Sequence, residues 1–316
     1  MDSLTGSAFF CEWNISLALR CWLEMILRNV TNPNIRIIFQ DIDGCLNPAD
    51  GEAFGVTEDW EPSNNQISML EAINTALEQS SIEHFVINTG RPWGLVRNLA
   101  KHFTSPKVRY FLVEHACALY DRQRGTYLNC EQMAAANGLD DLLTRYQNLA
   151  HIQILFDWYR DHGMALLEAH YQTPLPPVDK QANLSFRIPS GVDGEALLKH
   201  IESIARAQLA PAHIEPLLFL RSDNYIDILP GIHKLDGIHL LTAHLQLDRD
   251  HALAVGDYLN DIPVFEAFHQ VLCPANAHPQ IQALTRTKGH SGEVSEQAYG
   301  LATLNLLRGI PAIYKS

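Results

Sequence analysis

Apolar positions along the chain repeat with two different periods, and the two periods alternate. Residues 35–39, 84–88 and 108–114 are short apolar runs, as expected for buried strands. Between the first two runs, apolar residues recur at helical spacing over residues 67–77, and a second helical stretch begins at Pro92. Strand, helix, strand, helix in this order predicts a parallel sheet.

The rhythm changes after residue 121. Residues 122–215 contain long helical stretches, a turn-rich segment at 173–178 and a polar–apolar alternation at 182–188. This pattern predicts a separate α+β unit, and the strand-like runs 216–221 and 225–229 close it.

The parallel pattern then resumes, with a helix after Lys234 and a strand at residues 252–255. The chain therefore predicts an α/β fold in which a core of residues 34–121 and 216–316 carries an α+β domain inserted at 122–215. A length of 316 residues suits two domains of ordinary size.

Residues 1–33 form an extension of different character. Apolar side chains between Trp13 and Val30 fall broadly on one helical face, which predicts an amphipathic helix. Charged residues interrupt the segment and no basic region precedes it, so we expect neither a signal peptide nor a membrane span. Packing on its own domain is the first interpretation. Contact between subunits of a homo-oligomer is the second, and binding to a membrane surface is the last.

Composition and charge narrow the class of protein. Hydrophobic residues make up 47% and charged residues 19%, as in ordinary folded proteins. The formal charge of −13 argues against nucleic acid as a partner, so an anionic substrate has to meet a locally positive pocket. The 6 cysteines include no C-x-x-C pair, so we expect neither a zinc site nor a disulfide framework, and a reducing cytoplasm fits best.

Two carboxylates, Asp41 and Asp43, follow the strand at residues 35–39. Side chains two apart leave a strand on the same face, and Gly44 lets the backbone turn sharply beside them. Such carboxylates repel each other unless a cation lies between them, which indicates a hard ion such as Mg²⁺. Taken alone, the motif also fits an ordinary loop or a fragment of a calcium site.

Three further segments place polar groups at strand ends or helix starts. Thr89, Gly90 and Arg91 offer a hydroxyl, backbone N–H groups at a helix start and a guanidinium, all of which suit a phosphate; Thr89 alone also fits an N-cap. Lys234 is a lone cation near a helix start and, taken alone, fits a solvated lysine. The segment 256–261 adds an acid cluster at the sheet edge where open α/β sheets bind ligands.

In this order, the four segments resemble the signature motifs of the haloacid dehalogenase superfamily: Asp-x-Asp-Gly at 41–44, Thr-Gly-Arg at 89–91, Lys234, and Gly-Asp-x-x-Asn-Asp at 256–261. The insertion between the second and third motifs resembles the Cof-like and sugar-phosphate phosphatase branch. The resemblance runs from about residue 35 to the C-terminus and implies a Rossmann-like parallel-sheet core with an inserted α+β cap domain.

Smaller features support the resemblance or depart from it. Glu114-His115-Ala116 stands where such proteins commonly show Glu-Asn-Gly, and residues 274–277 resemble their late Asn-Ala segment. Cys45 replaces the commoner Thr, and the stretch 47–63 is longer and more acidic than usual. Nothing near Cys45 in the sequence marks an activated thiolate, so we expect it to pack rather than react.

The resemblance implies a magnesium-dependent phosphatase. Asp41 would attack phosphorus to form an aspartyl-phosphate, and Asp43 would act first as the general acid and then as the general base. The Asp41 carboxylate, the Asp43 backbone carbonyl and Asp257 would hold Mg²⁺, with Asp261 bound directly or through water.

Other matching residues would bind the substrate, a small phosphorylated metabolite of the sugar-phosphate kind. Thr89, Lys234 and Asn260 would hold the phosphoryl oxygens together with backbone N–H groups near Gly44 and Gly90, and Arg91 would add positive charge. A phosphomutase of the same superfamily and a catalytically silent phosphate-binding protein remain alternatives.

The alternation at residues 183–188 gives one expectation about the cap. Asn183, Ser185 and Arg187 share one face of the predicted strand, and the apolar residues between them pack on the other face. The polar face is either solvated or turned towards the site. In the second case, Arg187 would bind the part of the substrate beyond the phosphate.

Overall fold

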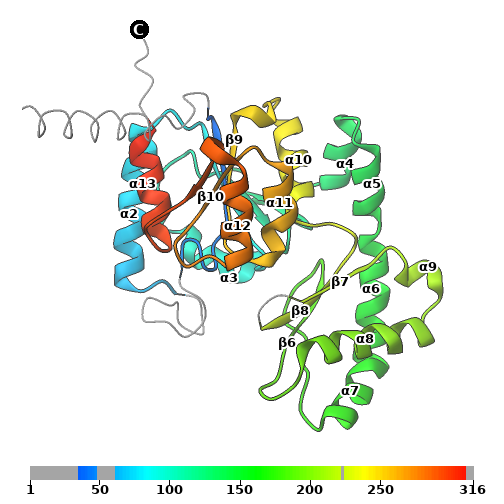
Figure 1. Ribbon diagram of the computed structural model, residues 1–316. Helices are drawn as coiled ribbons and strands as arrows, with labels where there is room; N and C mark the ends of the chain where they lie inside the picture. Colours follow the sequence, from blue (N-terminus) through cyan, green and yellow to red (C-terminus); the bar gives the residue numbers. More distant parts are fainter. Residues whose placement is uncertain (1–34, 48–60, 222–223, 311–316) are drawn as a thin grey trace, which may run out of the picture.

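The computed structural model describes residues 35–47, 61–221 and 224–310 (Figure 1). The predicted amphipathic helix of residues 1–33 and most of the acidic stretch 47–63 lie outside these residues. The three interpretations of that helix, among them a contact between subunits, therefore stay predictions. None of the helices within the described ranges is long and apolar enough to cross a membrane.

A large sheet forms the centre of the fold, with strand order β11-β10-β9-β1-β2-β3-β4-β5. Neighbouring strands from β11 to β3 pair in parallel, which confirms the predicted parallel sheet, and β4 and β5 extend one edge as an antiparallel hairpin. The strands are β1 (Ile37–Gln40), β2 (His84–Asn88), β3 (Tyr110–Val113), β4 (Ala118–Asp121), β5 (Thr126–Leu128), β9 (Ala252–Val255), β10 (Gln270–Cys273) and β11 (Gly292–Val294).

Helices cover both faces of this sheet (Figure 1). Because successive strand residues point to opposite faces, Ile38 packs in one apolar cluster while Ile37 and Phe39 pack in another. The first cluster includes residues of α2 (Asn64–Gln79), α3 (Trp93–Ala100) and α13 (Gly300–Gly309). The second includes residues of α4 (Cys130–Ala136), α5 (Asp140–Gln147), α10 (Lys234–His244), α11 (Ile262–Ala267) and α12 (Pro279–Thr287).

A smaller antiparallel sheet has its own core. Its strands, in the order β6-β8-β7, are β6 (Leu184–Arg187), β8 (Tyr225–Leu229) and β7 (Leu218–Arg221). The associated helices are α6 (Leu149–Trp158), the π-helical turn η1 (Tyr159–Gly163), α7 (Met164–Tyr171), α8 (Gly194–Gln208) and α9 (Pro211–Ile214). One apolar cluster, running from Ile152 to Ile228, holds these elements together.

Packing divides the chain differently from the predicted boundaries in two places. Helices α4 and α5 lie within residues 122–215 yet pack on the large sheet, because Met133, Leu142 and Tyr146 point into its second cluster. Strands β7 and β8 lie beyond residue 215 yet pair with β6. The domain boundaries themselves stay a prediction, while the apolar clusters group residues 152–228 as one unit.

The large sheet has a topological switch point beside β1. From β1 the chain continues through β2 and β3 on one side, and later returns through β9, β10 and β11 on the other. Ligand sites in open α/β sheets form outside the carboxyl ends of the strands at such a point. Gln40 is in register with Val255, so the residues that follow β1 and β9 emerge side by side.

Neighbouring residues on β6 give a test of the smaller core. Phe186 is fully buried, with its ring centroid 4.5 Å from that of Tyr159, whereas Arg187 is exposed. We expect Phe186→Ala to lower the free energy of unfolding by about 3–5 kcal/mol. Arg187→Ala should change it by less than ~0.5 kcal/mol. Denaturant unfolding of both variants measures this, and similar losses in the two would contradict the assigned faces.

Candidate active site

Asp41 lies at the centre of the predicted site. It follows β1, and its backbone N–H donates to the carbonyl of Val255 at 3.1 Å, which joins it to the end of β9. Asp41 is 5% exposed, and its carboxylate accepts hydrogen bonds from the Ile42 backbone N–H at 2.7 Å and from Lys234 Nζ at 2.5 Å. The structure therefore orients this carboxylate from two sides.

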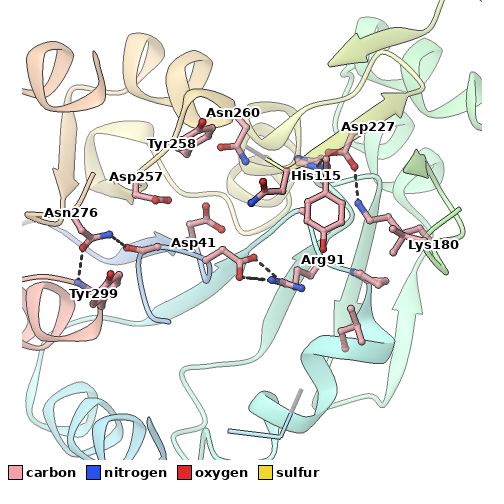
Figure 2. Close-up of a pocket in the computed structure, with 18 residues that line it drawn as sticks. Asp41, Arg91, His115, Lys180, Asp227, Asp257, Tyr258, Asn260, Asn276 and Tyr299 are labelled. Carbon is pink, nitrogen blue, oxygen red and sulfur yellow. Dashed lines mark hydrogen bonds and ion pairs between the residues drawn. The ribbon is translucent and has the colours of Figure 1, made fainter. Parts of the chain in front are cut away.

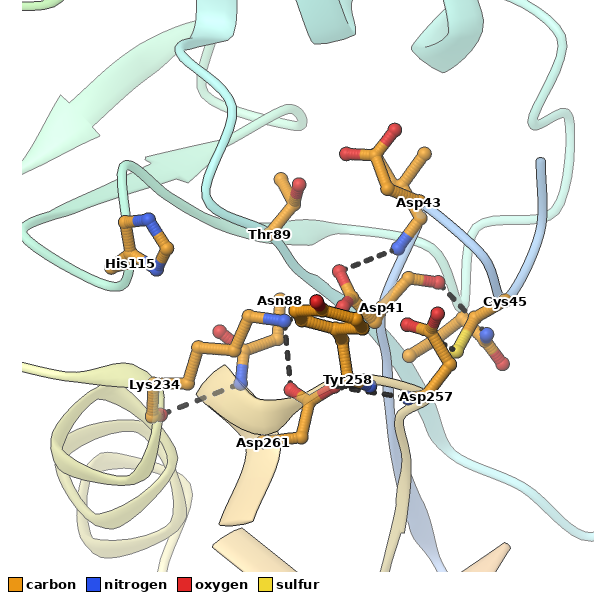
Figure 3. Close-up of polar contacts among 12 residues, drawn as sticks. Asp41, Asp43, Cys45, Asn88, Thr89, His115, Lys234, Asp257, Tyr258 and Asp261 are labelled. Atoms are coloured by element: carbon orange, nitrogen blue, oxygen red, sulfur yellow. Dashed lines mark hydrogen bonds and ion pairs between the residues drawn. The ribbon is translucent and has the colours of Figure 1, made fainter. Parts of the chain in front are cut away.

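Lys234 is a buried cation and not the solvated lysine that its isolated position in the sequence suggested. It begins α10, is 2% exposed, and donates from Nζ to Asp41 and, at 2.8 Å, to Asp261 (Figure 3). Burial opposes its charge, but the Asp261 and Asp41 carboxylates outweigh burial and raise the pKa of Lys234. Asp261 is in turn held by the Asp257 N–H at 3.0 Å.

Negative charge exceeds positive charge in this cluster. One ligand atom each from Asp41, Cys45 and Asp257 lies within 4.8 Å of the others. Burial raises the pKa of Asp41 to about 7 despite Lys234, and burial together with Asp41 raises the pKa of Asp257 well above its ordinary value. One lysine does not neutralise three neighbouring carboxylates, so the oxygen donors of Asp41 and Asp257 fit a hard divalent cation.

Cys45 takes part in this cluster as a packed thiol. It is fully buried, and its Sγ donates to Asp257 Oδ1 at 3.7 Å. Burial and the nearby carboxylate of Asp257 raise the pKa of the Cys45 thiol well above its ordinary value. A thiol that stays protonated is a poor nucleophile, in agreement with the packing expectation.

Gly44 provides the turn that the sequence predicted. Its φ is +68°, and a Cβ atom built at this position would lie 1.8 Å from Asp257 Oδ2. Its carbonyl accepts a hydrogen bond from Asn276 Nδ2 at 2.7 Å, and Asn276 Oδ1 accepts one from the Tyr299 N–H at 3.0 Å. Only glycine combines this backbone conformation with this approach to Asp257.

Asp43 differs from the expectation that its side chain shares a face with Asp41. The chain leaves the extended conformation at Ile42, whose carbonyl accepts hydrogen bonds from Cys45 and Leu46. The Asp43 carboxylate points away from the Asp257 and Asp261 carboxylates in Figure 3. It accepts hydrogen bonds from Arg91 Nε and Nη2, at distances of 2.9–3.1 Å.

The second motif forms a wall beside Asp41. Thr89 is fully buried, and its Oγ1 accepts a hydrogen bond from the Arg91 N–H at 3.2 Å. A Cβ atom at Gly90 would lie 2.6 Å from the ring of His115, so this ring lies against the glycine backbone. Asn260 reaches the site from the fourth motif, and no protein group bonds its buried side-chain oxygen within the described chain.

These residues open onto one cavity of about 380 Å³ (Figure 2). Asp41, Asp43, Gly44, Gly90, Arg91, Asp257 and Asn260 line it, and Lys234 and Asp261 lie beneath Asp41. The structure thus brings the four predicted motifs together. Figure 2 also shows a second wall, which includes Lys180 and Asp227.

The cap residue singled out by the sequence lies elsewhere. Arg187 is exposed and is not among the described residues that line the cavity. Asn183, which precedes β6, and Ser185, on β6, are fully buried rather than solvated, and Asn183 Nδ2 donates to the Glu114 carbonyl at 3.4 Å. Lys180 and Asp227 carried no sequence signal, because single charged residues in polar segments look like ordinary surface residues.

The structure thus shows a mainly parallel α/β sheet with a buried acid–lysine cluster at its carboxyl edge, the edge at which open α/β sheets bind ligands. The sequence matches the haloacid dehalogenase-like hydrolases over residues 38–289, and the chain belongs to this family. The resemblance inferred from the four motifs is therefore confirmed. No curated protein gave a significant match.

Solved structures of the same fold have diverged far in sequence. A protein of Thermoplasma acidophilum is 17% identical, with a TM-score of 0.56 over 87% of this chain and 98% of its own. The sucrose-phosphatase of Synechocystis, solved with sucrose and phosphate, is 18% identical, with a TM-score of 0.54 over 85% and 95%. A HAD-superfamily phosphatase of Bacteroides thetaiotaomicron is 16% identical, with a TM-score of 0.52 over 89% and 98%. At these identities the comparison establishes the fold.

Two glycines with the same backbone conformation test the Gly44–Asp257 contact. Gly44 and Gly125 have φ values of +68° and +69°, but a Cβ atom at Gly125 would meet nothing within 4 Å. Alanine at either position should cost about 1 kcal/mol of stability. Gly44→Ala should also displace the Asp257 carboxylate. We expect Mg²⁺ to raise the unfolding temperature of the wild type and to leave that of Gly44→Ala unchanged. An unchanged Mg²⁺ effect in Gly44→Ala would refute the contact.

Proposed function

We propose that this protein is a magnesium-dependent phosphatase that hydrolyses a small phosphorylated metabolite, with a sugar phosphate as the expected class. The position of Asp41 carries the proposal. Its carboxylate lines the cavity, is held by Lys234, and lies beside Asp257. Membership of a hydrolase family and the shared fold with a sucrose-phosphatase support the same reading.

In the first half of the reaction, an Asp41 carboxylate oxygen attacks phosphorus and the bond from phosphorus to the leaving oxygen breaks. Asp43 gives its proton to the departing alkoxide. Lys234 and the Ile42 N–H hold the Asp41 carboxylate through one oxygen each, so attack requires little reorientation of this side chain.

In the second half, Asp43 takes a proton from a water molecule that attacks the aspartyl-phosphate. The bond between phosphorus and the Asp41 oxygen breaks, which releases inorganic phosphate, frees the Asp41 carboxylate and returns Asp43 to its protonated form. Asp43 is the more exposed partner of its ion pair, with 38% of its side chain accessible against 17% for Arg91, so solvent reaches it.

The Asp43–Arg91 ion pair has to open during this cycle. Arg91 donates to both oxygens of Asp43, so this carboxylate is held as the partner of a guanidinium in the structure. A phosphoryl group in the cavity offers Arg91 an alternative bidentate partner. Transfer of Arg91 from Asp43 to phosphate would leave Asp43 able to exchange a proton with the leaving group.

Other side chains would hold the substrate and the metal. Thr89, Asn260 and the backbone N–H groups around Gly44 and Gly90 would bind phosphoryl oxygens. The carboxylates of Asp41 and Asp257 and the backbone carbonyl of Asp43 would hold Mg²⁺, which when bound neutralises charge on the phosphate. Asp261 already accepts hydrogen bonds from Lys234 and from the Asp257 N–H. It would therefore position these two residues, or bind Mg²⁺ through a water molecule.

Replacing the nucleophile tests the central step. Asp41→Asn should abolish release of inorganic phosphate from p-nitrophenyl phosphate and from sugar phosphates, because an amide of similar shape is a poor nucleophile. Asp157→Asn, at a half-exposed carboxylate on α6, is the matched control and should retain wild-type rates. Wild-type turnover by Asp41→Asn would exclude the mechanism. In the wild type, return of the phosphoryl group to the substrate without release of inorganic phosphate would indicate a phosphomutase.

Metal removal tests the cation. Excess chelator should stop hydrolysis of p-nitrophenyl phosphate, and added Mg²⁺ should restore it. Without the cation, the negative charge of the carboxylates around Asp41 would repel the phosphate. Asp257→Asn should raise the Mg²⁺ concentration needed for half-maximal rate. Full activity in excess chelator would contradict the metal assignment.

A further inference from the structure

Three successive residues between the two walls of the cavity have left-handed backbone conformations. Glu114, His115 and Ala116 have φ values of 52°, 58° and 70°, and none of them is glycine. Such conformations are unfavourable for residues with a Cβ atom and persist only where the surrounding structure fixes them. The position of this segment therefore calls for a functional explanation.

The segment joins the second motif to the smaller unit. The Glu114 and His115 N–H groups donate to the carbonyls of Arg91 and Thr89, each at 3.0 Å. On the other side, the Glu114 carboxylate accepts from the backbone N–H groups of residues 181 and 182, at 3.0 and 2.7 Å. The strained conformation thus holds the His115 side chain between the second motif, at residues 89–91, and the smaller sheet.

His115 leads into a buried polar chain. Its ring lies against Gly90, and its Nε2 is 3.5 Å from Asp227 Oδ2. Lys180 Nζ donates to Asp227 Oδ1 at 2.8 Å, so Asp227 lies between the other two side chains (Figure 2). All three side chains are at most 8% exposed and all line the cavity.

The polar chain of His115, Asp227 and Lys180 is electrically neutral as a whole. Burial lowers the pKa of His115, which keeps the ring uncharged at neutral pH. Burial alone would raise the pKa of Asp227, but Lys180 and His115 outweigh it and hold this pKa below the usual range. One ammonium, one carboxylate and one neutral imidazole together offer both hydrogen-bond donors and acceptors without excess charge.

We propose that Lys180, Asp227 and His115 form a leaving-group subsite, which binds adjacent hydroxyl groups on an uncharged part of the substrate. The inference rests on the proposed phosphatase function and deepens it. A hydroxyl both donates and accepts, so it can bond to Asp227 and Lys180 together. His115 would meet the part of the substrate nearest the phosphate, because its ring touches Gly90.

The same arrangement disfavours a second anionic group. Among the described residues, four carboxylates (Asp41, Asp43, Asp227 and Asp257) and two cationic side chains (Arg91 and Lys180) line the cavity. The phosphate and the metal would occupy the end of the cavity at Asp41, and Asp227 neutralises Lys180 at the other end. A second phosphate or a carboxylate would therefore face Asp227 without a spare positive charge.

The first test uses the wild-type enzyme with Mg²⁺ and a panel of hexose monophosphates, hexose bisphosphates and phosphoglycerate, with p-nitrophenyl phosphate as reference. A hexose monophosphate should give the highest kcat/KM. A bisphosphate or phosphoglycerate as the best substrate would overturn the inference. Failure to hydrolyse any of these compounds, p-nitrophenyl phosphate included, would instead refute the proposed phosphatase function.

The second test removes Lys180, the hydrogen-bond donor at the end of the polar chain farthest from the phosphate. Lys180→Met should raise KM for the best hexose monophosphate about tenfold more than KM for p-nitrophenyl phosphate, since only the hexose carries hydroxyls. Lys180→Arg should recover part of the difference. Lys199→Met, at an exposed lysine of α8, is the control and should leave both constants unchanged.

Thermal unfolding shows whether each variant is folded. If Lys180→Met does not fold, His115→Gln gives the same comparison, because glutamine keeps polar groups near Asp227 but shifts their position. The expected result is again a selective rise in KM for the hexose. Equal changes for both substrates would assign these residues to structure alone, and no change for either would place them outside the substrate's reach; both results would overturn the inference.

Discussion

The structure depends on the buried ammonium group of Lys234, which lies among carboxylates. Lys234 bonds to both Asp41 and Asp261, and Asp257 lies next to them. Burying these charges costs several kcal/mol per ion unless each one finds a partner. The start of α10 therefore has to meet the ends of β1 and β9, and the parallel sheet with its switch point beside β1 brings these segments together.

Close approach of backbone to side chains completes the site. Gly44 leaves room for the Asp257 carboxylate, and Gly90 leaves room for the His115 ring. A side chain at either position would separate the walls that have to meet around a phosphate. The charge cluster and the two glycines thus act together, because the cluster fixes the carboxylates and the glycines let the neighbouring segments reach them.

The strained run of residues 114–116 shows how the core and the smaller unit share one site. Its backbone bonds to the second motif, while the Glu114 carboxylate bonds to the smaller unit. Strain of this kind is stable only when the rest of the fold outweighs it, and here both cores support the segment from opposite sides. The cavity is therefore a shared product of two separately packed units.

The sequence alone determined the parallel sheet and the four motifs at its carboxyl edge, because runs such as residues 84–88 and 252–255 are buried on both faces and each ends in a local polar segment. It missed the hairpin β4–β5, whose outer strand is short and largely exposed. Only the tertiary structure buried Lys234, paired Asp43 with Arg91, and joined Lys180 to Asp227. Local patterns record burial and turns, whereas the partner of a charged side chain depends on which distant segments the fold brings together.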